Sequence, residues 1–302
     1  MTIDNLKSFL EEFGDDVKFS SDLKKKNWFN IGGKAKVFYT ADNLNNLINF
    51  LKKINNQERI FILGAGSNTL ITDNIFDGIV IKLGKNFRNI SLLGEDIIIA
   101  GSAALDKSLS TFAAENSIAG FEFLSCIPGT IGGGIRMNAG CFNSEFKDLL
   151  VSVQAVDKFG NVKTISAKDI KFDYRKSNLP DDLVFLSASF KAIRGKINEI
   201  KDKIDKLKKE KEKNQPLKIK TSGSTFKNPI SQTKKKVWEL IKESVPLNQK
   251  FGDAYISEKH CNFFVNRGNA SFDDMKKLID FVSKKVLEKT GINLEKEIKI
   301  LK

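Results

Sequence analysis

Histidine and cysteine are scarce in this 302-residue sequence, which contains one histidine and three cysteines. Cys126, Cys141 and Cys261 form no CxxC pair and stand in no histidine-rich stretch, so the sequence predicts no metal site. A sparse, odd number of cysteines is typical of a reducing compartment. We therefore expect a protein that works in such a compartment without a bound metal.

Long apolar runs are also missing. No run approaches the roughly 18 residues of a membrane span, and the acidic, amphipathic N-terminus has no cleavable apolar core. These absences predict a soluble cytoplasmic protein that has neither a signal peptide nor a membrane partner.

Basic residues are in excess, and the net charge of +13 permits nucleic acid, a membrane surface or an anionic small molecule as partner. A single-strand nucleic-acid binder interleaves aromatic with basic side chains. Here the phenylalanines stand in apolar alternation, and the lysine-rich helix expected over 196–213 contains none. We interpret that helix as a solvated linker between domains and expect no nucleic-acid partner.

Hydrophobic periodicity predicts an α+β protein in two or three parts. An amphipathic helix is expected over 44–54 after a cap at Thr40, and another over 271–291, where Ser271 and Asp274 form a capping box. Further helices are expected over 103–117 and 233–244. Strands are expected over 59–63, 78–83, 96–102, 150–167 (a hairpin), 183–193, 260–268 and 295–301.

The first of two glycine-rich segments is "ILGAGSNTL", residues 62–70. Gly64 and Gly66 follow an expected strand, as a dinucleotide-binding GxGxxG requires, but Thr69 replaces the third glycine and no helix follows. A P-loop is excluded because no Gly-Lys-Ser/Thr appears. What remains is a tight loop whose N–H groups, helped by the Ser67 and Asn68 side chains, suit a diphosphate.

The second segment is "IPGTIGGGIRMNAG", residues 127–140. We expect a turn at Pro128 and Gly129, close backbone approach to a ligand at 132–134, and an end at Asn138 and Gly140. Each segment alone fits a tight turn near a core equally well. Two of them in one domain favour one large phosphate-bearing cofactor.

Seven motifs occur in order: "NWFNIGGKA", "LGAGSN", "IPGTIGGGIRMNAG", "DYRKSNLP", "GSTFKNP", "SEKHCNFFVNRGNAS" and "NLEKEIKIL". Together they resemble the UDP-N-acetylenolpyruvoylglucosamine reductase family from about Asn27 to the end of the chain. The resemblance implies FAD, NADPH as reductant, and reduction of UDP-GlcNAc enolpyruvate to UDP-N-acetylmuramate, a bacterial cell-wall precursor. We expect the FAD to be non-covalent, because the first glycine-rich segment has no histidine or cysteine that could tether it. The tyrosine-bearing insertion of one subtype has no counterpart, so the shorter subtype is expected.

The fold that the resemblance implies is α+β, with a two-part FAD-binding module of the vanillyl-alcohol-oxidase type and a C-terminal α+β substrate-binding domain. The expected boundaries are 1–83 and 84–195 for the two FAD-binding subdomains and 196–302 for the substrate-binding domain. The cofactor-binding residues expected from it are Gly64, Ala65, Gly66, Ser67, Asn68, Thr69, Pro128, Gly129, Thr130, Gly132, Gly133, Asn138 and Gly140. The chain departs from the family pattern at Ala65 and Cys126, where glycine is common, and at Arg136, where an aromatic or apolar residue is frequent.

The resemblance also implies the catalytic residues. Arg175 matches the arginine that binds the substrate carboxylate, and Ser224 matches the proton donor. Glu297 matches the catalytic glutamate, which orients Arg175 or tunes protonation of the intermediate, whereas Glu295 is expected to have no such role. The expected substrate-binding residues are Tyr174, Lys227, Asn228, His260, Lys218 and Lys220, the two last as diphosphate partners on charge and position only.

One alternative stays open at this point, which is another FAD-dependent oxidoreductase of the same fold that oxidises a small alcohol or hydroxy acid. Many such enzymes tether FAD through a histidine or cysteine in the first glycine-rich region. Residues 62–70 contain neither, and the motif "GSTFKNP" favours the reductase. No residue pattern indicates the preference for NADPH over NADH, and we expect a monomer.

Overall fold

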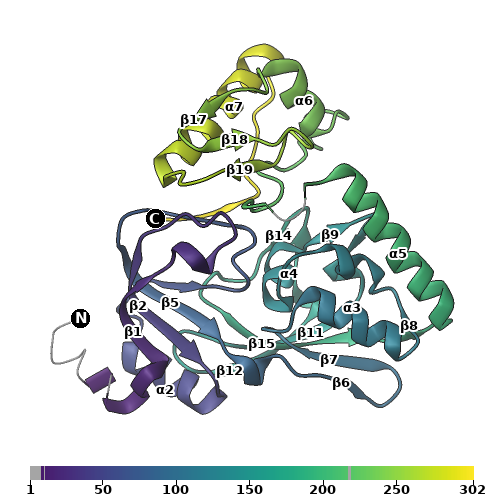
Figure 1. Cartoon of the computed structure of the whole chain (residues 1–302). Helices are drawn as coiled ribbons and strands as arrows, with labels where there is room; N and C mark the ends of the chain where they lie inside the picture. Colours follow the sequence, from purple (N-terminus) through teal and green to yellow (C-terminus); the bar gives the residue numbers. More distant parts are fainter. Residues whose placement is uncertain (1–7, 10, 217–218) are drawn as a thin grey trace. The chain divides into compact units, whose positions relative to one another are not determined.

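The computed structural model describes residues 8–9, 11–216 and 219–302, whose contacts form two compact units (Figure 1). Unit 1 contains the described residues up to Ser21, Ala35–Ala65 and Asp77–Lys209. Unit 2 contains Asp22–Lys34, Gly66–Phe76 and the described residues from Glu210. The chain therefore passes between the units several times, and the loop of the first glycine-rich segment is divided between Ala65 and Gly66.

Unit 1 holds a four-stranded sheet in the order β1-β2-β5-β3. Its strands are Val17–Asp22, Lys34–Ala41, Phe76–Leu83 and Ile60–Ile62, and α2 spans Leu44–Ile54. Tyr39 of β2 stacks on Phe50 of α2 with ring centroids 3.8 Å apart. The cap expected at Thr40 is wrong, because β2 runs on through Ala41 and the Asn43 side chain accepts the N–H of Asn46.

A five-stranded antiparallel sheet in the order β12-β11-β15-β7-β6 forms the rest of unit 1. Its strands are Val162–Ser166, Leu150–Val156, Val184–Lys191, Ile97–Gly101 and Ile90–Leu93, and the helices packed with it are α3 (Asp106–Glu115) and α4 (Ile131–Met137) (Figure 1). Shorter strand pairs are β8 (Ile118–Ala119) with β16 (Ile193–Arg194), β9 (Gly140–Cys141) with β10 (Ser144–Glu145), and β13 (Phe172–Asp173) with β14 (Lys176–Ser177). The hairpin expected over 150–167 is confirmed as β11 and β12.

The second glycine-rich segment differs from the turn-and-loop structure expected for it, because helix α4 occupies its centre. Thr130 caps the helix, and Asn138 ends it in the left-handed conformation, with φ 41°. Glycine disfavours helices by about 1 kcal/mol per residue relative to alanine, so the local sequence argued against a helix. Tertiary hydrogen bonds from Ile131 N–H to Ala104 and from Gly132 N–H to Ser102 offset that preference.

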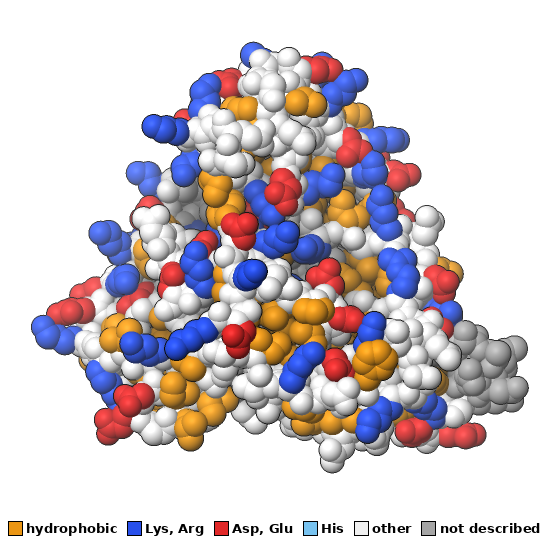
Figure 2. All heavy atoms as spheres, turned by 180° about the vertical axis from the view of Figure 1, so that it is seen from behind, with side chains coloured by type: hydrophobic (Ala, Val, Ile, Leu, Met, Phe, Trp, Pro, Cys, Tyr) orange, Lys and Arg blue, Asp and Glu red, His pale blue; other side chains and the backbone are white. Residues whose placement is uncertain are grey.

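Helix α5 (Ile197–Asn214) confirms the lysine-rich helix expected over 196–213. Ile200, Ile204 and Leu207 form its buried stripe, and Lys203 pairs with the buried carboxylate of Glu122 at 3.3 Å. On the face drawn in Figure 2, lysine and arginine side chains are interspersed with aspartate and glutamate side chains. The positive charge is therefore distributed on that face and not gathered in one patch.

Unit 2 contains the three-stranded antiparallel sheet β17-β18-β19 and helices α6 and α7. The strands span Lys250–Phe251, Ala254–Ile256 and Phe264–Asn266, and the helices span Val237–Ser244 and Phe272–Thr290. The capping box of Ser271 and Asp274 on α7 is confirmed. A parallel pair joins β4 (Thr69–Ile71) to β20 (Lys299–Leu301).

The described residues of both units also contain short 3₁₀ helices, which occupy Gly14–Asp16, Lys24–Lys26, Lys85–Phe87, Glu122–Cys126, Phe146–Asp148 and Ala167–Asp169. No helix in the described part of the chain has the length and apolarity to cross a membrane.

Candidate functional site

A cavity of about 390 Å³ lies within unit 1, and both glycine-rich segments line it. The expected cofactor residues in its wall are Gly64, Ala65, Thr130, Gly132 and Gly133. Sequence reasoning missed several other lining residues, among them Lys82, Arg88, Ser102, Ser108, Arg136 and Phe185. Lys82 and Phe185 come from β5 and β15, Ser108 comes from α3, and Arg88 and Ser102 come from the segments before β6 and after β7, so the tertiary fold places these five beside the glycines. Arg136 belongs to the second glycine-rich segment itself, on α4.

The two glycine-rich segments meet at Gly64 and Thr130. A Cβ on Gly64 would lie 2.6 Å from Thr130 Oγ1, closer than side chains tolerate. The N–H groups of Gly64 and Ala65 donate to no acceptor among the described residues. Free main-chain donors beside a cavity with Ser102 and Thr130 hydroxyls suit a diphosphate.

Each glycine of α4 is explained by a different structural requirement. A Cβ on Gly134 would lie 2.2 Å from the Phe146 ring, and one on Gly132 would lie 3.1 Å from the Cβ of Ser102. Gly133 lines the cavity, and its Cβ would meet nothing of the chain closer than Thr130 Oγ1 at 3.5 Å. Close packing within the chain thus explains Gly134, whereas the bare backbone at Gly133 faces open space in the cavity.

The remaining residues of the first loop belong to unit 2 and do not line this cavity. Gly66 adopts φ 68°, its carbonyl accepts the N–H of Trp28 at 3.0 Å, and a Cβ there would lie 2.3 Å from Lys26 O. The Asn68 side chain donates to Glu297 O at 3.1 Å. Ser67 follows Gly66 in the same loop, and Thr69 begins β4. Gly66 and Asn68 therefore bind parts of their own unit.

The ends of the second segment likewise have partners in the chain. The Gly129 carbonyl, next to Pro128, accepts the N–H of Asp106 at 3.2 Å. Asn138 is fully buried, and its side-chain nitrogen donates to Glu145 at 3.0 Å and to Asp173 O at 3.1 Å. A Cβ on Gly140 would lie 2.3 Å from Ser144 O, so the β9–β10 turn requires this glycine.

Arg175 stands in the two-residue loop of the β13–β14 hairpin, in the left-handed conformation with φ 55°. Its guanidinium donates to Gly140 O at 2.5 Å and to Asn138 O at 3.4 Å. Glu145 pairs with it at 3.5 Å, and the ring of Tyr174 lies 4.9 Å from its central carbon. A non-glycine residue in this conformation costs about 1–2 kcal/mol, and such strain gathers at functional sites.

Glu145 is a residue of this site that sequence reasoning missed. Besides Arg175, its carboxylate pairs with Lys147 at 2.9 Å and accepts from Asn138. The carboxylate thus connects the end of α4 to the arginine hairpin. A signal for it in the sequence is weak, because nothing but its place shortly after the glycine-rich segment distinguishes it from other acids.

Ser224 and Glu297 lie close in the backbone pairing of unit 2. Ser224 forms a bridge with Phe263, and the neighbouring Thr225 carbonyl accepts the N–H of Glu297 at 2.8 Å. The Glu297 residue is half-buried, whereas the Glu295 side chain is 73% exposed and pairs with Lys227. The two glutamates therefore have different surroundings despite their spacing of two residues.

The expected substrate residues of unit 2 are spread over several elements. Asn228 Oδ1 accepts the N–H of Val237 at 3.0 Å, at the start of α6. The His260 ring lies 4.8 Å from that of Phe263, and burial lowers the pKa of this histidine below its ordinary value. Lys218 lies outside the described residues.

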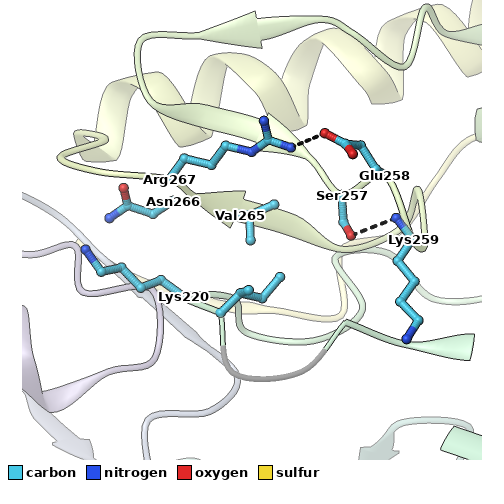
Figure 3. Close-up of a pocket in the computed structure, with 8 residues that line it drawn as sticks. Lys220, Ser257, Glu258, Lys259, Val265, Asn266 and Arg267 are labelled. Atoms are coloured by element: carbon cyan, nitrogen blue, oxygen red, sulfur yellow. Dashed lines mark hydrogen bonds and ion pairs between the residues drawn. The ribbon is translucent and has the colours of Figure 1, made fainter. Parts of the chain in front are cut away.

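Lys220 lines a second cavity, of about 450 Å³, within unit 2 (Figure 3). Lys259 and Arg267 also border it, and Arg267 points toward Glu258 and pairs with it at 2.5 Å. The Lys220 amine donates to the carbonyl of Gly268 at 3.0 Å, so its charge has a neutral partner there. The described residues contain no group of three or more histidine, cysteine or acidic side chains placed to hold a metal ion.

Comparison with known proteins defines first a class, that of FAD-binding flavoproteins, because a family model described as an FAD binding domain matches residues 35–166. A second model, the C-terminal domain of UDP-N-acetylenolpyruvoylglucosamine reductase, matches residues 215–301. The chain belongs to the UDP-N-acetylenolpyruvoylglucosamine reductase family. The family resemblance of the seven motifs, the expected fold and the FAD cofactor are thereby confirmed, and the small-alcohol oxidase alternative loses its basis.

Individual relatives carry the same name. The reductase of Pelagibacter ubique is 64% identical over 302 residues and covers 100% of both chains. The reductase of Rickettsia typhi is 44% identical over 292 residues, which is 97% of this chain and 98% of that one. The crystal structure of the Thermus caldophilus enzyme (MurB) matches with a TM-score of 0.80 and 28% identity, over 95% of this chain and 98% of that chain.

Proposed function

We infer that this chain catalyses the FAD-dependent reduction of UDP-GlcNAc enolpyruvate to UDP-N-acetylmuramate with NADPH, in the synthesis of bacterial peptidoglycan precursors. The observation that carries this conclusion is the match over the full length of both chains to a reductase that is 64% identical. The cavity of unit 1, with free N–H donors at Gly64 and Ala65, is the feature of the structure that fits the cofactor.

Reduction of an enol ether beside a carboxylate has three requirements, which are a hydride at C3, a proton at C2, and stabilisation of the charge that develops at C2 and in the carboxylate. FAD, once it is bound and reduced by NADPH, would supply the hydride. The side chains of this protein must therefore bind the carboxylate, hold it in place and donate the proton.

We propose that Arg175 binds the carboxylate of the substrate. Hydrogen bonds to main-chain carbonyls and the ion pair with Glu145 orient the guanidinium before a substrate arrives. A pre-oriented guanidinium binds a carboxylate through its fork and stabilises it more as negative charge accumulates. Tyr174, stacked near the guanidinium, is proposed to border the same substrate group.

We propose that Ser224 donates the proton to C2 of the substrate. A serine hydroxyl is a weak acid, so it needs fixed geometry and a polarising neighbour. The bridge to Phe263 holds the Ser224 backbone, and the hydrogen bond from the Glu297 N–H to the Thr225 carbonyl places the glutamate on the adjoining segment. Glu297 is therefore proposed to tune this protonation, with Glu295 engaged by Lys227 instead.

The anionic part of the substrate is proposed to bind to unit 2. Lys220 shares its cavity with Lys259 and Arg267, which makes that cavity a candidate site for the diphosphate. Lys227, Asn228 and His260 are further proposed contacts, which rest on the family resemblance, and Lys218 is proposed on its charge and position in the sequence alone.

The assignment of a ligand to each domain rests on the same family resemblance. We propose that 1–83 and 84–195 hold FAD through the cofactor residues named above, of which five line the cavity of unit 1 and the other eight rest on the resemblance alone, and that 196–302 holds the sugar nucleotide. We further propose a cytoplasmic monomer without nucleic-acid or membrane partners. Sedimentation of the purified protein measures the monomeric state, and a dimer at working concentration would contradict it.

Anaerobic half-reactions test the function. NADPH should bleach the flavin absorbance, and UDP-GlcNAc enolpyruvate should restore it. A flavin that small alcohols reduce, and that the sugar nucleotide fails to reoxidise, would overturn the proposed substrate.

Single-turnover reoxidation tests Ser224. Ser224→Ala should slow this step by about 10²–10⁴-fold, the usual range for general-acid assistance, and leave reduction by NADPH unchanged. Ser224→Cys should keep more activity, because a thiol also donates. Ser222→Ala is the matched control, since Ser222 is buried and its hydroxyl donates to Thr69 O. Reoxidation of Ser224→Ala at the parent rate would show that another group donates the proton.

A further inference from the structure

Arg136, at the end of α4, lines the cavity of unit 1 in which FAD is proposed to bind. Its Nη1 donates to the carbonyls of Leu179 at 2.9 Å and Pro180 at 2.6 Å, and its Nη2 donates to that of Leu183 at 2.8 Å. Three hydrogen bonds from a rigid guanidinium restrict the orientation of its plane.

One face of that plane is already covered. The central carbon of Arg136 lies 4.3 Å from the centroid of the Phe185 ring, which is within the range of cation–π contacts. Phe185 is itself buried and also lines the cavity. Since the edges donate to carbonyls and one face lies on Phe185, the opposite face of the guanidinium is the surface that remains for a ligand.

The electrostatics support a stacking contact over an ion pair. Burial lowers the pKa of Arg136, while Asp181 and Asp182 act in the opposite direction, and arginine stays charged in either case. No carboxylate among the described residues forms an ion pair with its guanidinium. A desolvated, planar cation attracts the face of an aromatic ring more strongly than an exposed one does.

Position along α4 agrees with this role. Arg136 follows Gly132 by one helical turn, an axial rise of about 6 Å. In FAD, each end of the diphosphate continues through a sugar or ribityl unit to an aromatic ring system. A ligand whose diphosphate lies at the glycine end of the cavity therefore has a ring system within reach of Arg136.

We propose that Arg136 is a cofactor-binding residue that stacks on an aromatic ring system of FAD, either the purine or the isoalloxazine. The proposal rests on FAD binding alone, so it stands or falls independently of the sugar substrate. A stacked, partly desolvated guanidinium of this kind is worth about tenfold in affinity.

The test uses the purified holoenzyme and follows FAD release by the fluorescence gained on dilution. Arg136→Met keeps the length of the side chain and removes the planar cation, so FAD should dissociate at about tenfold lower dilution. Arg136→Lys restores the charge without the plane and should recover only a small part of the loss. Full recovery in the lysine variant would overturn stacking in favour of simple charge attraction.

Two further measurements complete the test. Pro180→Gly loosens the loop that Arg136 holds but leaves the guanidinium, and it should retain FAD; an equal loss would show that Arg136 acts only through the loop. The absorption bands and midpoint potential of the bound flavin distinguish the rings. A shift in Arg136→Met indicates the isoalloxazine, and weaker binding with an unchanged spectrum indicates the purine. Wild-type retention of FAD in Arg136→Met would refute the proposal.

Discussion

The two glycine-rich segments of this chain look alike in sequence and differ in structure. The loop that begins at Gly64 leaves the N–H groups of Gly64 and Ala65 without acceptors among the described residues. In the second segment, the first-turn N–H groups of α4 donate within the chain, including that of Gly134 to Thr130 O at 2.8 Å. One segment offers its backbone to a ligand, whereas the other mainly builds a helix and its neighbours.

The difference shows that glycine content alone does not locate a phosphate site. Gly134 is required by Phe146, and Gly140 by the turn that contains Ser144. Gly133 alone among the α4 glycines has room for a side chain and faces the cavity. The C-terminal end of the second segment also orients Arg175, because the carbonyls of Asn138 and Gly140 accept hydrogen bonds from its guanidinium.

The largest effect on activity is expected when Arg175, which the second segment holds, is replaced. Arg175→Lys should slow flavin reoxidation by UDP-GlcNAc enolpyruvate by at least about 10²-fold, because lysine loses the bidentate geometry. Reduction by NADPH should persist. Stopped-flow measurement of both half-reactions checks this, and equal losses in the two would mean that Arg175 serves the cofactor or the fold.

Packing of α4 should produce the next largest effect. Gly134→Ala places a Cβ within 2.2 Å of the buried Phe146 ring, and overpacking of this kind costs about 1–3 kcal/mol. We expect a lower free energy of unfolding in urea. The double variant Gly134→Ala, Phe146→Leu should lose less than the sum of the two single changes; strict additivity would contradict the contact.

Local rules of the sequence predicted the elements that depend on near neighbours. The α7 capping box needs only Ser271 and Asp274, and it is present. Thr40 failed as a cap because strand pairing extends β2 beyond it. Helix α4 was missed because hydrogen bonds from its first-turn N–H groups to the carbonyls of Ala104 and Ser102, and not helix propensity, hold its first turn.

The site shows the same division. Gly64, Ala65 and Gly133 carry a pattern that reads as a ligand loop, and they line the cavity. Arg136 and Glu145 act through contacts that only folding creates, such as the carbonyls of a loop more than 40 residues away. Nothing near Arg136 in the sequence indicates those carbonyls, and nothing near Glu145 indicates its pairing with Arg175.

A buried acid beneath the second segment should make stability depend on pH. Asp106 is fully buried, neither carboxylate oxygen has a partner among the described residues, and desolvation raises the pKa of this carboxyl well above its ordinary value. The folded state therefore holds a proton that the unfolded chain loses above about pH 4. Stability from this group is complete below that pH and declines as the pH rises through the folded-state pKa.

Asp106→Asn removes this titration. The variant should match the parent near pH 4 and become the more stable of the two as the pH rises to 8, in urea unfolding at several pH values. Glu115→Gln, at the exposed end of α3, is the control and should leave the pH profile unchanged. Parallel profiles for Asp106→Asn and the parent would contradict the burial argument.

The junction of the two segments should have a moderate effect on the cofactor. In Gly64→Ala, the new methyl group contacts Thr130 Oγ1 and stands beside the free N–H donors. We expect FAD to dissociate about tenfold more readily, or about 1.4 kcal/mol, as measured by fluorescence of the released flavin. The double variant Gly64→Ala, Thr130→Ala, which removes the hydroxyl that the new methyl group would meet, separates the clash from the loss of access when it is compared with Thr130→Ala alone. Undiminished FAD retention in Gly64→Ala would mean that this loop is a structural turn.

The smallest effect, and the one that separates packing from ligand access, is expected at Gly133. Its position is helical, and a Cβ there meets only an ordinary contact at 3.5 Å. Gly133→Ala should therefore stabilise the FAD-free protein by about 0.5–1 kcal/mol through helix propensity. The same methyl group projects toward the cavity, so FAD should bind several-fold more weakly. Thermal unfolding without FAD measures the gain in stability, and the additional stabilisation by excess FAD measures the loss in affinity. Gly134→Ala is the opposite control, because it should lose stability in both conditions. A stabilised Gly133→Ala that keeps its full FAD affinity would show that the cofactor does not approach this backbone.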